Sequence, residues 1–107
     1  MGKIRHCGED MFFEAILSLR TVEECRAFLE DVCTIKELQS MAQRFQVACQ
    51  LSEGSNYIEV YDATGASSAT ISRVNKCLNY GGGGYRTVLE RLKEEGRIPH
   101  GGNDTQA

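Results

Sequence analysis

Apolar residues recur at helical spacing along most of the chain. Between residues 35 and 51 they stand three or four positions apart, which is the period of one helix face. Shorter stripes of the same kind cover residues 22–32 and 85–92. No segment alternates apolar and polar residues as a half-buried strand would. The pattern predicts an all-α protein with six helices and no sheet.

Local signals mark where these helices begin. A hydroxyl or amide residue stands three positions before a glutamate at Thr21 and Glu24, at Thr34 and Glu37, and at Asn56 and Glu59. This spacing is typical of a capping box, in which each side chain binds the other residue's backbone N–H. Ser67 is the expected N-cap of the next helix, and the glycines at 81–84 are the expected hinge before the last one.

The first helix is apolar on most of its circumference. Seven of the nine residues from 11 to 19 are apolar: Met11, Phe12, Phe13, Ala15, Ile16, Leu17 and Leu19. A helix of this kind must be covered nearly all round, and a short chain has few elements to spare for that task. Burial against a second subunit is the simpler solution, so we expect a homodimer.

Length and composition limit the remaining possibilities. The 107 residues carry a net charge of −3, with 41% apolar and 25% charged residues, which suits one globular domain. We expect a flexible N-terminus (1–8), a single helical domain (9–96) and a disordered tail (97–107). No apolar run is long enough to span a membrane, and no signal peptide is recognisable, so a cytoplasmic protein without membrane contact is expected.

Metal and catalytic chemistry have little support in the sequence. The five cysteines are widely spaced without a CxxC motif, which predicts neither disulfides nor a zinc site. Four of them (Cys25, Cys33, Cys49 and Cys77) are expected to fill buried helix positions. The two histidines, His6 and His100, fall in the expected tails, and no nucleophile–base spacing stands out. We therefore expect no enzyme, no metal and no cofactor.

The most informative segment covers residues 56–78. Two short helices flank Gly65, with Val60 five positions before it and Ala66, Ile71 and Val74 one, six and nine positions after it. The glycine permits a sharp turn, and the apolar positions hold two helices at a large angle. This spacing predicts a helix-turn-helix whose second helix projects its N-terminal turn outward, where it can enter a major groove.

The second helix carries side chains suited to that position. Short hydroxyl residues can approach phosphates and base edges, small apolar groups can meet a thymine methyl, and two cations follow. The candidate DNA-binding residues are Ser67, Ser68, Ala69, Thr70, Ser72, Arg73 and Lys76. Between Gly65 and Lys93 five cations and one acid give a local charge of +4, which leaves −7 for the rest of the chain. A basic distal third on an acidic body suits one DNA-facing surface.

Three segments make a family resemblance visible: FFEAILSLRTVEEC, AFLEDVCTIKELQSMAQRF and ATGASSATISRVNKCLNYGGGGYRTVL. They closely resemble the Trp-repressor-like YerC/YecD family, bacterial helix-turn-helix proteins related to the tryptophan repressor. The resemblance covers roughly residues 9–92. It implies an intertwined homodimer with two recognition helices about 34 Å apart, which reads a pseudo-palindromic operator in double-stranded DNA. The implied function is transcriptional regulation, with repression as the expected output.

The resemblance also bears on an effector. Arg44 and Arg73 match repressor arginines that hold the tryptophan carboxylate and stack on its indole, but Val74 stands where the repressor has a glycine. An isopropyl group there overfills the indole space, at a cost of about 1–3 kcal/mol. We expect that tryptophan is not the effector, while another small effector in a pocket of Arg44, Arg73 and Val74 remains open. Arg44 can equally pair with a carboxylate or a helix end.

Tyr61 is a second departure, because the position four before the turn glycine is usually small. Either its ring swings outward or the crossing of the two helices opens. The alternative function is a helical protein–protein adaptor that kept the fold without DNA binding, and the acidic body and Tyr61 are its best support.

Overall fold

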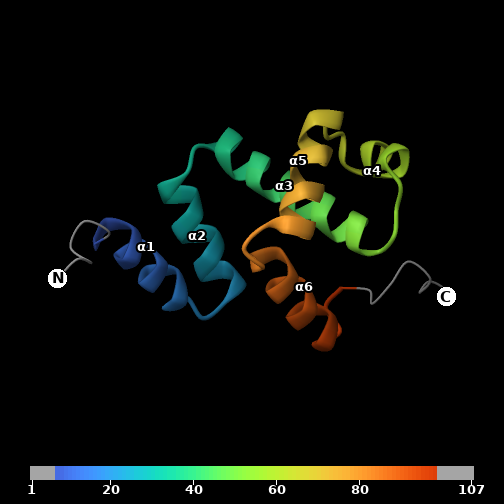
Figure 1. Ribbon diagram of the computed structural model, residues 1–107. Helices are drawn as coiled ribbons and strands as arrows, with labels where there is room; N and C mark the ends of the chain where they lie inside the picture. Colours follow the sequence, from blue (N-terminus) through green and yellow to red (C-terminus); the bar gives the residue numbers. More distant parts are fainter. Residues whose placement is uncertain (1–6, 99–107) are drawn as a thin grey trace. The chain divides into compact units, whose positions relative to one another are not determined.

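The computed structural model describes residues 7–98, which form six α-helices and no strand (Figure 1). The all-α prediction is therefore confirmed for these residues. The helices are α1 (Cys7–Leu17), α2 (Val22–Val32), α3 (Ile35–Ser52), α4 (Tyr57–Thr64), α5 (Ser68–Tyr80) and α6 (Gly84–Glu94).

The chain divides into two compact units, with the boundary between Leu38 and Gln39 inside α3. The first unit contains α1, α2 and the first turn of α3, and the second contains the remainder of α3 together with α4, α5 and α6. A single domain over residues 9–96 stays a prediction.

The predicted capping pairs form in the structure. The Thr34 hydroxyl accepts from the Glu37 N–H at 3.1 Å, and the Glu37 carboxylate accepts from the Thr34 N–H at 2.8 Å. Asn56 and Glu59 form the same reciprocal pair at 2.9 and 2.8 Å. At the start of α2 the Thr21 hydroxyl accepts from the Glu24 N–H. The Glu24 carboxylate accepts from the N–H of Arg20, one residue before Thr21. These bonds satisfy N–H groups that a helix start leaves without partners.

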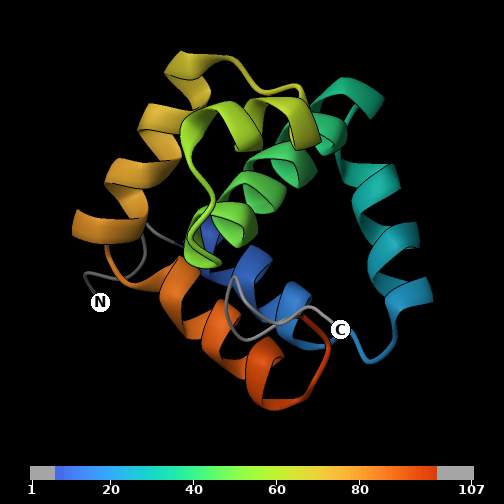
Figure 2. The same ribbon diagram turned by 90° about the vertical axis from the view of Figure 1, so that its right-hand side faces the viewer.

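The second unit is built on one apolar core. Its seven buried residues come from α3, α4, the turn after α4, α5 and α6. Figure 2 shows these helices in a second view, coloured in chain order. They are Val47, Ala48, Val60, Ala66, Ile71, Val74 and Leu89, all at most 3% exposed. Every helix of this unit therefore contributes to the same cluster, so the turn between α4 and α5 is anchored from both sides.

The first unit has a different character. Phe12 and Phe28 stack across α1 and α2 with ring centroids 6.0 Å apart, but no residue of α2 is buried. Large apolar side chains of α1 stay open to solvent in the single chain, among them Met11 at 63%, Phe13 at 57% and Leu17 at 80%. The hydrophobic effect disfavours such exposure, so this unit has an apolar surface without a cover.

The cysteine prediction is wrong for the single chain. Cys25 and Cys77 are exposed, while Cys33 and Cys49 are only half-buried. Cys49 packs against the core of the second unit but stays partly exposed, while Cys25 lies on α2, which has no buried residue. None of the four forms a disulfide.

Both ends of the described chain differ from the expected boundaries. The helix α1 begins at Cys7, inside the segment expected to be flexible, and Glu9 and Asp10 in its first turn complement the positive end of the helix dipole. At the other end, Ile98 packs against the core, so order continues two residues into the expected tail. Residues 1–6 and 99–107 lie outside the described part.

We expect Ile71→Ala to lower the free energy of unfolding by about 2–5 kcal/mol, because it leaves a cavity in the core. The matched control is Ile58→Ala, since Ile58 is 74% exposed and Ile71 is 1% exposed. The control should cost less than about 1 kcal/mol. Urea unfolding followed by circular dichroism measures both, and equal losses would contradict the assignment of the core.

Candidate nucleic-acid interface

The turn between α4 and α5 is fixed by backbone geometry and by hydrogen bonds. Gly65 adopts the left-handed conformation at φ 74°, which side-chain-bearing residues rarely adopt. The Thr64 hydroxyl donates to the Val60 carbonyl at 2.8 Å and accepts from the Ala66 N–H at 3.1 Å. From α3, the Gln43 side chain donates to the Thr64 carbonyl at 3.1 Å. The turn is thus tied to both α3 and α4.

The helix α5 has one buried and one exposed face. Ile71 and Val74 are each 1% exposed and belong to the core, which holds the helix in place. Six of the seven candidate DNA-binding residues are exposed: Ser67, Ser68, Ala69, Ser72, Arg73 and Lys76. Thr70 is half-buried. The sequence therefore placed Ile71 and Val74 on the core side and six of the seven candidates on the solvent side correctly. Cys77 of the same helix, which was expected to be buried, is exposed.

Two of the candidate hydroxyls already have partners. Ser67 caps α5, because its hydroxyl oxygen accepts from the Thr70 N–H at 3.1 Å. The same hydroxyl donates to the Thr70 hydroxyl oxygen at 3.1 Å. The exposed Ser68, Ala69 and Ser72 are then better placed to meet a base edge, while Ser67 and Thr70 mainly shape the start of the helix.

Tyr61 is 57% exposed, which agrees with the outward orientation of its ring. It lines a shallow groove with Tyr57, Ile58, Ser68 and Ile71. Tyr57 is 40% exposed and Ile58 is 74% exposed. An aromatic and apolar patch thus lies directly beside the start of α5.

The three residues of the suggested effector pocket have different surroundings. Val74 lies in the core, and Arg73 is exposed on α5. Arg44 is half-buried and donates from Nη1 to the Ser40 hydroxyl at 3.2 Å, one turn earlier on α3. Arg44 therefore has a structural partner within its own helix, and a joint effector role for the three residues stays a prediction.

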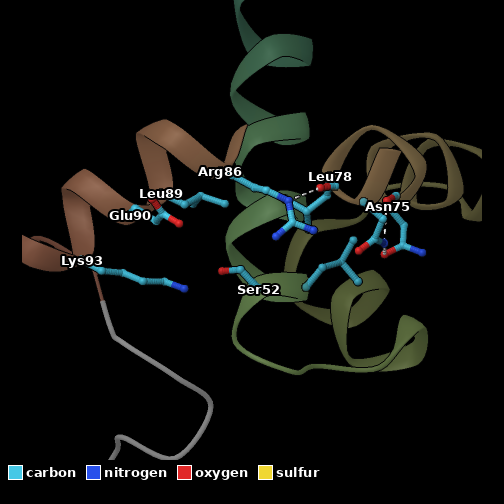
Figure 3. A pocket seen from close by; sticks show the side chains of 9 residues that line it. Ser52, Asn75, Leu78, Arg86, Leu89, Glu90 and Lys93 are labelled. Atoms are coloured by element: carbon cyan, nitrogen blue, oxygen red, sulfur yellow. Dashed lines mark hydrogen bonds between the residues drawn. The ribbon is translucent and has the colours of Figure 1, made fainter. Parts of the chain in front are cut away.

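The sequence reading missed a polar pocket of about 300 Å³ where the C-terminal ends of α3 and α5 meet α6 (Figure 3). Its lining residues are Leu51, Ser52, Asn75, Leu78, Asn79, Arg86, Leu89, Glu90 and Lys93. The spacing of Arg86, Glu90 and Lys93 on one face of α6 is a signal that could have suggested it. The α3 residues are distant in sequence from those of α5 and α6, so only packing reveals that all of them share a site.

The pKa of Cys49, on α3, is shifted by its surroundings, which include the pocket residue Lys93. Burial raises the pKa of Cys49, the carboxylate of Glu53 raises this pKa further, and the ammonium of Lys93 lowers it. The net shift is upward, so Cys49 stays a neutral thiol to higher pH than a solvated cysteine.

Neither a membrane span nor a metal cluster is found among the described residues. Across residues 7–98 the structure contains no helix with the length and apolar character of a membrane span. Over the same described stretch, no three metal-binding side chains of the His, Cys, Asp or Glu type gather into a candidate site.

The sequence and the fold are both similar to those of known proteins. The sequence model of the Trp repressor protein family matches residues 8–93. The chain is 52% identical over 94 residues to YerC of Bacillus subtilis (strain 168), whose function is uncharacterized, with 88% of this chain and 90% of YerC covered.

Two crystal structures also share the fold. A proposed Trp repressor from Staphylococcus aureus matches with a TM-score of 0.80 and 42% identity, covering 86% of this chain and 92% of that one. A TrpR-like protein from Eubacterium eligens ATCC 27750 matches with a TM-score of 0.80 and 49% identity, covering 87% and 96%. Since the family model spans most of the sequence and both solved structures match at a TM-score of 0.80, the chain belongs to the Trp repressor family.

Proposed function

We propose that this protein is a sequence-specific DNA-binding regulator of transcription, acting as a repressor in the bacterial cytoplasm. One observation carries the proposal: an exposed, hydroxyl-rich and cationic face of α5 is held rigidly by the buried Ile71 and Val74 behind it. Rigid support matters because base readout requires side chains in fixed positions. Membership of the Trp repressor family supports the same role, and that family is regulatory rather than enzymatic.

The binding step is non-covalent. The N–H groups at the start of α5 and the cations of Arg73 and Lys76 seat the protein on phosphates. The side chains of Ser68, Ala69 and Ser72 then face the base edges in the major groove. Because the phosphate contacts release counterions, binding weakens steeply with added salt.

The uncovered apolar surface of the first unit supports an intertwined homodimer. Side chains of α1 such as Phe13 and Leu17 are more than half exposed in one chain, and a second copy offers a matching apolar surface. A twofold dimer presents two α5 helices to two half-sites, so the operator is pseudo-palindromic. Joining two weak half-site contacts in one molecule raises the overall affinity through effective concentration.

A protein–protein adaptor is the second candidate function. The patch of Tyr57, Ile58 and Tyr61 favours it, because aromatic and apolar side chains gather there on the surface of the helix-turn-helix. Because these three side chains include no cation, they suit an apolar protein surface better than a phosphate backbone. A pull-down that recovers a protein partner but no DNA would favour the adaptor over the regulator.

Removing the α5 cations should weaken operator binding. We expect Arg73→Ala to cost about 1–3 kcal/mol of binding free energy. Lys76→Ala should lower the magnitude of the slope of log K against log salt concentration by about one. Operator DNA is selected from a random pool, and affinity is measured by mobility shift at several salt concentrations. Lys36→Ala removes an exposed cation of the first unit and is the matched control. If both α5 variants bind like this control, the proposal is wrong.

A charge on the apolar surface of α1 should break the dimer. Leu17 is 80% exposed in the single chain, and Leu17→Glu would bury a carboxylate twice in a symmetric interface. We expect the dimer dissociation constant to rise by more than about tenfold in sedimentation equilibrium. Ile58→Glu, a matched change on α4, should leave it unchanged. A parent protein that sediments as a monomer would refute the dimer.

Tryptophan should not bind with useful affinity. Val74 occupies the place of the repressor glycine and is part of the core, so the indole finds no free space beside it. Calorimetric titration of the full chain with tryptophan is expected to give no saturable heat at micromolar concentrations. A micromolar dissociation constant would overturn this argument.

A further inference from the structure

The polar pocket where α3, α5 and α6 meet contains a fixed guanidinium group. Arg86 Nε donates to the Leu78 carbonyl at 2.8 Å, which anchors the side chain of α6 on the last turn of α5 (Figure 3). This bond leaves the two terminal nitrogens available to a ligand. A planar pair of N–H donors matches two oxygens of a phosphate or carboxylate group. Because the side chain is already held, less conformational entropy is lost on binding.

A second cation lies in the same pocket. Lys93 is half-buried, and Figure 3 shows its ammonium group reaching toward Ser52 at the end of α3. The Ser52 hydroxyl donates to the Cys49 carbonyl at 2.9 Å, so its oxygen remains an acceptor. The influence of Lys93 on the Cys49 pKa agrees with an ammonium group held beside α3. The cation is therefore directed inward, toward the wall formed by α3.

The α5 wall adds a neutral donor. The side-chain nitrogen of Asn79 donates to the Asn75 backbone carbonyl at 2.9 Å and to the Asn75 side-chain oxygen at 3.1 Å. These bonds orient the Asn75 amide and leave its nitrogen as a donor. Leucines 51, 78 and 89 supply the apolar part of the lining, and Leu89 is only 3% exposed. A partly apolar wall strengthens hydrogen bonds and charge interactions within the pocket.

The balance of charge in the pocket is positive. Glu90 is the single acid among the lining residues, against the two cations Arg86 and Lys93. Among the described residues the recorded ion pair joins Arg97 to Glu95, so Glu90 neutralises neither cation by direct contact. Two unpaired cations around a concave space of about 300 Å³ favour a small anion.

We propose that this pocket binds a small, free anion carrying a phosphate or carboxylate group. The DNA backbone fits less well, because the pocket lies at the C-terminal end of α5. Ser68 and Asn79 are 11 positions apart on this helix, which corresponds to about 16 Å along its axis. The site is also distinct from the pair of Arg44 and Arg73. Through Arg86 and Asn75, a bound anion joins α6 to the helix that we propose reads DNA.

The test is a titration of the full chain with inorganic phosphate, followed by amide NMR, with sodium chloride at equal ionic strength as reference. We expect saturable shifts at residues 51–52, 75–79 and 86–93. Arg86→Gln and Lys93→Gln should each weaken phosphate binding by about tenfold or more. Arg91→Gln removes an exposed cation from the same helix outside the pocket lining and should change the affinity less than about twofold.

Several results would overturn the proposal. Chloride could produce the same shifts as phosphate, or Lys93→Gln could bind phosphate as well as Arg91→Gln does. Arg86→Gln removes a hydrogen bond to α5 and so can destabilise the fold. Lys93→Gln is the second variant, because the Lys93 ammonium has no ion-pair partner in the part of the chain that the structure describes. A third contrary result is that the two pocket variants lose operator affinity in phosphate-free buffer while phosphate titration shows no saturation. The DNA backbone would then be the occupant. Since phosphate binding is measured without DNA, its failure leaves the proposed regulator function untouched.

Discussion

The shared burial of Val60 from α4 with Ile71 and Val74 from α5 is the interaction on which the rest of the second unit depends. It closes the helix-turn-helix around Gly65, whose left-handed backbone allows the sharp turn between α4 and α5. With one face of α5 fixed in the core, its other face is presented as a rigid row of small polar and cationic side chains. The DNA-binding proposal rests on this division between the two faces.

Burial is distributed unevenly along the chain. The buried residues lie between Val47 and Leu89, whereas α1 and α2 leave large apolar side chains exposed. A helix pair with so little internal burial gains little stability from its own contacts, because hydrophobic stabilisation scales with the apolar area removed from water. The two units therefore suit the two proposed tasks, in which the second unit reads DNA and the first pairs with a second copy.

The last helix, α6, is joined both to the core and to the end of α5. Leu89 belongs to the core, while Arg86 caps the end of α5 through the Leu78 carbonyl. Without these contacts the glycines between α5 and α6 would hold α6 only loosely against α5, since glycine restricts the backbone little. One buried leucine and one charged hydrogen bond thus connect α6 to α5. The same arrangement creates a cationic pocket that a small anion could occupy and so stiffen this connection.

The sequence by itself determined the helices, their caps and the two residues, Ile71 and Val74, by which α5 enters the core. These features depend on residues at most a few positions apart, such as Thr34 with Glu37, or on the helical period that places Ile71 and Val74 together. Only the tertiary structure decided that Cys25 and Cys77 are exposed, that the Tyr61 ring points outward, and that Arg86 and Lys93 share a pocket with Ser52 and Asn75. Those facts arise from how different helices pack against one another and from which helix faces they leave uncovered. A local pattern records which side of a helix is apolar, but not which neighbour covers that side.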